Sequence, residues 1–225
     1  MALQDIINSA VNIEINRSKL VAQNVSRSGR LSVASRNWSN PFRFTITPKP
    51  IWSAAEYRRV FEPIFNADRF STQVIELTDH NTSTGAITAA GMSWLTAYQG
   101  GLDSAGDGTL DSYTATSMTG TSLTLTKSGS PTVGTYIVKA GDYLRISGGS
   151  YPYIATADVQ VSASATAVIT THRGNLQTFS SGTAVLVGQR AAVFNVVVTK
   201  LPQLRYLPGQ FVEFTSDFEL VEEIL

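Results

Sequence analysis

The sequence predicts a mainly β protein with one short helix. Apolar and polar residues alternate along many short segments, and turn residues separate these segments roughly every 8–12 positions in the middle of the chain. Regular short strands with such turns are typical of β-sandwiches and small barrels. The composition agrees with this fold class, because 43% of the 225 residues are hydrophobic and only 15% are charged.

Four strands are predicted in the first 50 residues, at 11–16, 19–25, 30–35 and 42–46. The first and the last show a clear period of two, which indicates strands with one buried face. The segment at 26–30, Ser-Arg-Ser-Gly-Arg, supplies the turn between the second and third strands. A Pro-Lys-Pro segment ends the fourth, because proline cannot donate to a strand ladder.

A capping box predicts the start of the one helix. Ser53 and Glu56 have the spacing at which each side chain bonds the backbone N–H of the other residue. The apolar residues that follow recur at helical spacing: Tyr57, Val60, Phe61 and Ile64. Pro63 is expected to end or kink this helix. Strand character returns at 72–77.

Residues 80–190 differ in their charged and aromatic residue content from both ends of the chain. They carry five basic and five acidic residues, whereas residues 1–79 carry ten and seven and residues 191–225 carry two and five. Aromatic, charged strands return after residue 190. The sequence therefore predicts a discontinuous outer domain formed by 1–79 and 191–225, with 80–190 inserted as a small β-barrel module. Two sequential domains are the alternative, since they would produce a similar shift. Residues 100–112 are predicted to be a loop.

The segment 138–156 is predicted to form a hairpin of the inserted barrel, turning at two consecutive glycines. Leu144 and Ile146 lie two positions apart, so they share one face of a strand and are assigned to the core. Tyr143 and Arg145 then point outward, and truncating Tyr143 is expected to cost little stability.

Few residues are suited to catalysis or to metal binding. The chain has no cysteine and only two histidines, His80 and His172, which are not at metal-ligand spacing. The acidic segment 103–111 fails the EF-hand pattern, because Ala105 stands at its third position. A looser calcium site there is the alternative to a solvated loop. No G-x-S-x-G motif occurs. The sequence therefore predicts no enzymatic activity, no cofactor and no metal.

Acidic side chains gather near the C-terminus and are interpreted as a solvated or subunit-facing rim rather than as a glycosidase pair. These residues are Asp217, Glu219, Glu222 and Glu223.

A basic run without any acidic residue is the candidate interaction site. Its six members are Arg17, Lys19, Arg27, Arg30, Arg36 and Arg43. Such a run can contact phosphates, or it can form a subunit interface with an acidic surface. Because the formal net charge of the chain is zero, the interface is the favoured interpretation. The N-terminus has no signal-peptide pattern and no apolar run approaches membrane-spanning length, which predicts synthesis in the cytoplasm and no membrane partner.

Three parts of the sequence resemble proteins of the tail tip and baseplate of tailed bacteriophages. Residues 23–64 combine a self-pairing strand, an Arg-rich turn, a Trp-bearing strand, a proline exit and a short helix. Residues 138–174 are similar to the small β-barrel inserts of such proteins. Residues 194–224 are similar to the closing strands of a tail-tube-like domain.

The resemblance implies a virion structural protein: a distal tail, tube-initiator or hub-like protein, made in the host cytoplasm and carried in the virion tail. Its copies would form a ring, six-fold in the commonest arrangement and three-fold in some hub proteins. The ring would join the tail tube to hub, baseplate or fibre proteins, and the only nucleic acid would be DNA passing through the lumen.

Two further functions are weighed against this one. The aromatic hairpin at 143–153, with Trp94 and Tyr98, favours a carbohydrate-binding β-sandwich module. A hydrolase with a site between subunits is the third possibility, for which the sequence offers no catalytic geometry.

Overall fold

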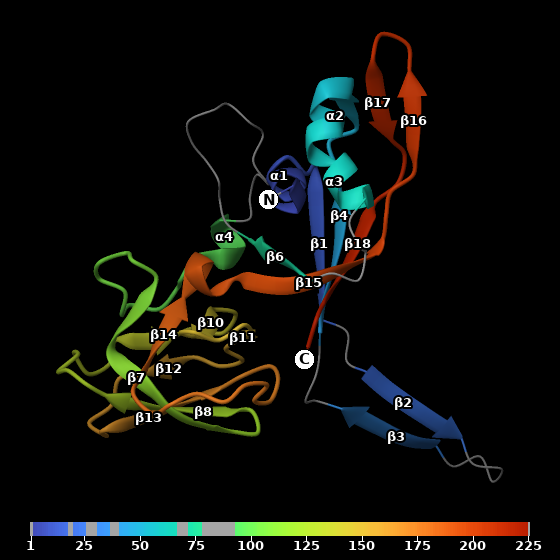
Figure 1. Ribbon diagram of the computed structural model, residues 1–225. Helices are drawn as coiled ribbons and strands as arrows, with labels where there is room; N and C mark the ends of the chain where they lie inside the picture. Colours follow the sequence, from blue (N-terminus) through green and yellow to red (C-terminus); the bar gives the residue numbers. More distant parts are fainter. Residues whose placement is uncertain are drawn as a thin grey trace.

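The computed structural model is mainly β and describes residues 2–17, 20–25, 31–36, 41–66, 72–77 and 93–224. Two hydrophobic cores organise these residues, one built largely from the two ends of the chain and one from its middle. Figure 1 shows the middle part to one side of the sheet that carries both termini.

The first sheet is assembled from both ends of the sequence. Its five strands have the order β1–β4–β18–β15–β6, and neighbouring strands are antiparallel. The strands are β1 (Asn12–Arg17), β4 (Phe42–Thr47), β18 (Phe218–Glu222), β15 (Val193–Lys200) and β6 (Gln73–Glu76). The buried side chains of β4 alternate along the strand, as the sequence predicts.

Three short helices pack together beside this sheet: α1 (Ala2–Asn8), α2 (Ala54–Val60) and α3 (Glu62–Asn66). Helix α1 contacts β6, and α2 and α3 pack against α1. The predicted capping box is present, with the Glu56 N–H donating to Ser53 Oγ at 3.3 Å and the Ser53 N–H donating to Glu56 Oε2 at 3.2 Å. The helix breaks at Phe61, so Pro63 lies in the first turn of α3. Helix α1 was not predicted from the sequence.

Two smaller sheets extend from the first. The strands β4 and β18 lead into a three-stranded sheet of order β16–β17–β5, made of β16 (Leu204–Leu207), β17 (Phe211–Phe214) and β5 (Ile51–Ser53). A separate hairpin contains β2 (Leu20–Val25) and β3 (Leu31–Arg36). Figure 1 shows this hairpin projecting away from the body of the molecule.

The middle of the chain forms a six-stranded antiparallel sheet that curls into a half-barrel, with the order β11–β10–β14–β7–β8–β13. Its strands are β11 (Pro152–Ile154), β10 (Tyr143–Ile146), β14 (Thr183–Val187), β7 (Thr109–Thr119), β8 (Ser122–Lys127) and β13 (Thr166–Thr170). The two edge strands approach each other through a single bridge between Ala155 and Thr171. The remaining elements are β9 (Tyr136–Val138), β12 (Val159–Gln160), α4 (Ser93–Thr96) and the 3-10 helix η1 (Gly188–Ala191).

The prediction of a loop over 100–112 was wrong at its end, because β7 begins at Thr109. This strand buries Leu110, Tyr113, Ala115 and Met118 in the second core. A distortion of the backbone at Ser112, where φ is 60°, interrupts the alternation of buried residues between Leu110 and Tyr113.

The prediction of which β10 side chains are buried was correct for Leu144 and Ile146 and wrong for Tyr143. Leu144 and Ile146 are buried in the second core, as predicted. Tyr143 points to the opposite face but is only 3% exposed, because that face packs against the first core. Its ring lies 6.2 Å from Phe194 and 6.4 Å from Phe42, measured between centroids. The expectation that truncation of Tyr143 costs little is therefore corrected.

We expect residues 1–79 with 191–225, and residues 80–190, to be two folding units. The Leu77 N–H donates to the Ala192 carbonyl at 2.9 Å, so the chain leaves and re-enters the first sheet at adjacent points. Replacing residues 80–190 by a short glycine-containing turn should convert β6 and β15 into a hairpin and leave a domain that melts cooperatively. A non-cooperative melt by circular dichroism would contradict this division of the chain.

Candidate assembly interface

The structure places only part of the predicted basic run. Lys19, Arg27 and Arg30 lie outside the described residues, and for Arg36, at the end of β3, only the main chain is described. The two remaining members, Arg17 and Arg43, are both exposed, on the neighbouring strands β1 and β4.

Arg17 and Arg43 face opposite sides of the sheet. Arg17 is paired with Phe42, and Arg43 with Asn16 and Val221. Directly paired residues share a face and successive residues alternate, so Arg17 is on the face of Phe42 and Arg43 on the other. Arg17 and Arg43 can therefore both take part in subunit contacts only if neighbouring subunits bind to both faces of the sheet.

A buried ion pair joins the two cores and was not foreseen. Arg173, which follows β13, donates from Nη1 to Glu222 Oε2 at 2.6 Å and from Nη2 to Glu222 Oε1 at 2.8 Å. Both side chains have 0% exposure. The guanidinium also donates to the Pro152 carbonyl, and Glu222 Oε2 accepts the Phe42 N–H at 3.0 Å. This two-pronged geometry fixes the orientation of one core against the other.

Glu222 therefore corrects the interpretation of the C-terminal carboxylates as a solvated rim. Glu219 does fit that interpretation, because it is half-exposed and forms a surface ion pair with Lys200 at 2.8 Å. Glu219 and Glu222 lie three positions apart on β18, so they point to opposite faces, one toward solvent and one toward the inserted module.

Aromatic rings surround the buried pair. The Arg173 guanidinium carbon lies 5.2 Å from the centroid of Phe42 and 5.5 Å from that of Tyr153, a cation–π arrangement. His172 packs on the same Phe42 ring at 5.2 Å, and its Nδ1 accepts the Ile154 N–H at 3.0 Å. Burial, with the positive charges of Arg173 and Arg17, lowers the pKa of His172 to about 3, so this imidazole is neutral at pH 7.

Asp142, of the Gly141-Asp142 pair near the start of the predicted hairpin, holds two segments of the chain together. Asp142 is buried and accepts backbone N–H groups from Lys139 at 2.8 Å, Gln99 at 2.9 Å and Gly100 at 3.2 Å. Burial raises the pKa of Asp142, and the three N–H donors oppose that rise. The carboxylate thus ties the segment after α4 to the turn before β10.

The tyrosine rings of the hairpin proposed for carbohydrate contact are not at the surface. Tyr143, Tyr151 and Tyr153 are all buried. Tyr98 is half-buried, and its hydroxyl donates to the Ile137 carbonyl. The side chain of Trp94 is not among the described residues' side chains.

Acidic groups in the loop at 103–111 are bonded within the loop. Asp103 accepts the N–H groups of Asp107 and Gly108, and Asp111 accepts both the N–H and the hydroxyl of Ser104. Over the described ranges, no three His, Asp or Glu side chains form a group suited to a metal ion. His80 falls in the undescribed segment 78–92.

Large apolar side chains remain exposed on both parts of the molecule. The outer part exposes Val11, Ile51, Tyr206 and Phe211, and the inserted part exposes Val133 and Val168. The hollows of ligand size among the described residues include one of about 650 Å³ between β6, α4, β10 and η1 and one of about 600 Å³ between α2 and the β16–β17 hairpin.

No helix within the described ranges has the length and apolar character needed to cross a membrane. Comparison with protein-family models produces no match, and comparison with curated proteins produces no significant match. The functional argument therefore depends on the geometry of the chain and on its sequence patterns.

Proposed function

We propose that the protein is a structural component of a bacteriophage tail, a ring-forming protein at the tail tip or baseplate. The first sheet would contribute to the wall that continues the tail tube, and the half-barrel would face hub, baseplate or fibre proteins. This role requires no catalytic residue and no cofactor. It follows the sequence resemblance, which covers residues of β2–β5, of β10 to β13 and of β15 to β18.

One observation supports assembly most directly: the β2–β3 hairpin pairs with no third strand in the described part of the chain. An isolated two-stranded hairpin is marginally stable in water, because it lacks a face to bury. This hairpin projects from the body (Figure 1), so a neighbouring subunit is the natural source of its missing contacts. The exposed apolar residues and the zero net charge also favour association.

The test uses Arg27 and Arg30, which lie in the sequence between β2 and β3. The double variant Arg27→Glu/Arg30→Glu should reduce the oligomer mass measured by light scattering, because like charges would now face an acidic neighbour. The matched control is Lys49→Glu/Arg59→Glu, which makes the same charge change at two exposed positions outside the hairpin.

Two results would contradict the proposal. If both double variants lose mass equally, the effect comes from net charge and not from the hairpin. If the hairpin variant assembles normally but loses a salt-sensitive affinity for duplex DNA, the basic run binds phosphates instead.

A further inference from the structure

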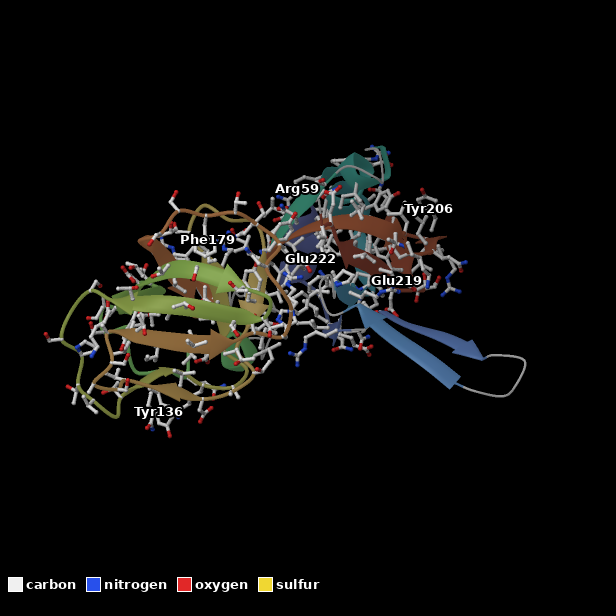
Figure 2. The ribbon with its side chains drawn as sticks, turned by 90° about the horizontal axis from the view of Figure 1, so that it is seen from below. Arg59, Tyr136, Phe179, Tyr206, Glu219 and Glu222 are labelled. Carbon is white, nitrogen blue, oxygen red and sulfur yellow. The ribbon has the colours of Figure 1, made fainter. Side chains whose placement is uncertain are left out.

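The hollow between α2 and the β16–β17 hairpin, here called the α2 groove, has an aromatic wall. Its volume is about 600 Å³, within the usual range for ligand sites, and its lining includes Tyr57, Tyr206 and Phe211. Tyr206 is 70% exposed and Phe211 is 45% exposed. Figure 2 shows Tyr206 at the end of the molecule away from the inserted module, where Tyr136 and Phe179 lie.

The register of the small sheet explains why the ring of Tyr206 is uncovered. Tyr206 pairs with Val212, and Val212 pairs with Trp52, so the three side chains share one face. Helix α2 covers that face over β17 and β5, where Val212 and Trp52 are buried. Helix α2 does not reach over β16, so the Tyr206 ring on that strand stays exposed.

Tyr57 forms the buried base of the groove. Its ring is edge-on to Tyr206, with 6.5 Å between centroids. Burial, followed by the charge of the neighbouring Tyr206 and a hydrogen bond with it, raises the pKa of Tyr57 to about 12, so the two tyrosines are coupled through their hydroxyls.

Planar polar side chains complete the lining. Arg58, Glu62 and Gln210 border the groove beside the rings, and the single positive and single negative charge balance. The Gln210 carbonyl accepts the Ala54 N–H at 2.8 Å, which holds the hairpin turn on the start of α2, although Gln210 has a positive φ of 65°. The strands of the wall are hydrogen-bonded in the order β16–β17–β5, so β16 is an edge strand of this sheet in the described part of the chain.

We propose that the α2 groove binds a neutral oligosaccharide of β-linked, gluco-configured units. Such sugars carry their substituents equatorially, so each ring has flat apolar C–H faces and a rim of hydroxyls. An exposed tyrosine ring matches the faces, and amide, carboxylate and guanidinium groups match the hydroxyls. An extended peptide added to the edge strand β16 is the competing occupant; because it would bind through main-chain hydrogen bonds, its binding should survive the loss of the Tyr206 ring.

The test uses the full chain with cellohexaose and chitohexaose as probes and maltohexaose as the α-linked comparison. Calorimetry should give a Kd no weaker than about 1 mM for at least one β-linked probe. Tyr206→Ala should weaken that binding about tenfold, since an aromatic contact contributes on the order of 1 kcal/mol beyond its buried area. The matched control is Tyr136→Ala, which removes a ring from the inserted module and should leave the Kd unchanged.

Each other outcome would overturn the proposal. These outcomes are no binding of either β-linked probe, binding of maltohexaose alone, or equal losses in the two tyrosine variants. A lower oligomer mass for Tyr206→Ala without sugar binding would assign the groove to a second copy of the chain. Ring formation by the wild-type protein is measured separately, so failure of the saccharide proposal leaves the assembly proposal standing.

Discussion

Replacing Glu222 by alanine should lower the free energy of unfolding by about 3–5 kcal/mol, because the change leaves the Arg173 guanidinium buried without its carboxylate. It also removes the acceptor of the Phe42 N–H, a second buried donor. Chemical denaturation followed by circular dichroism measures the loss. We expect both cores to be weakened, since Arg173 belongs to the inserted part and Glu222 to the first sheet.

The control is Glu219→Ala on the same strand. Its carboxylate forms an exposed pair with Lys200, so the expected cost is below about 1 kcal/mol. The double variant Arg173→Met/Glu222→Leu should recover much of the loss, because two apolar side chains of similar volume leave no buried charge. Equal costs for Glu219→Ala and Glu222→Ala would show that the Arg173–Glu222 pair does not stabilise the fold.

The strands and the helix with local signals were predictable. Each depends on contacts within a few residues: the alternation of β4, the capping box of α2 and the break of the helix at Phe61, two residues before Pro63. These patterns have the same meaning wherever the segment lies in the fold, because they come from backbone geometry.

Two of the missed elements, α1 and β7, had weaker or overlooked signals. Helix α1 buries Leu3, Ile6 and Ile7, and this helical spacing is visible in the sequence. Strand β7 is rich in serine and threonine, and its Asp-Gly-rich entry is typical of a loop. Its cross-strand pairing with β8 and β14 decides its conformation, and such pairing cannot be read from one segment alone.

The ion pair between the two cores could not be predicted from local sequence patterns. Glu222 lies in an acidic C-terminal segment that indicates a solvated surface, and Arg173 is a lone cation 49 residues away. Their burial follows from the packing of the half-barrel against the first sheet. The aromatic hairpin likewise gave no sign that its strand β10 is covered on both faces.

Truncating either Tyr143 or Leu144 to alanine should be strongly destabilising. Leu144→Ala should cost about 2–5 kcal/mol, and Tyr143→Ala a similar amount by analogy with buried phenylalanine, because both side chains are almost fully buried. The matched control is Tyr136→Ala, a half-buried tyrosine of the same module with an expected cost well below that of Tyr143→Ala.

The double variant Tyr143→Ala/Leu144→Ala separates the two cores. Tyr143 belongs to the first core and Leu144 to the second, on opposite faces of β10. We expect the two costs to add in denaturant melts because the side chains pack in different cores; coupling of these adjacent residues through the backbone would appear as a deviation from additivity. A small cost for Tyr143→Ala would show that the half-barrel does not pack on the first sheet through this ring. A large deviation from additivity would show that the two cores respond to β10 as one.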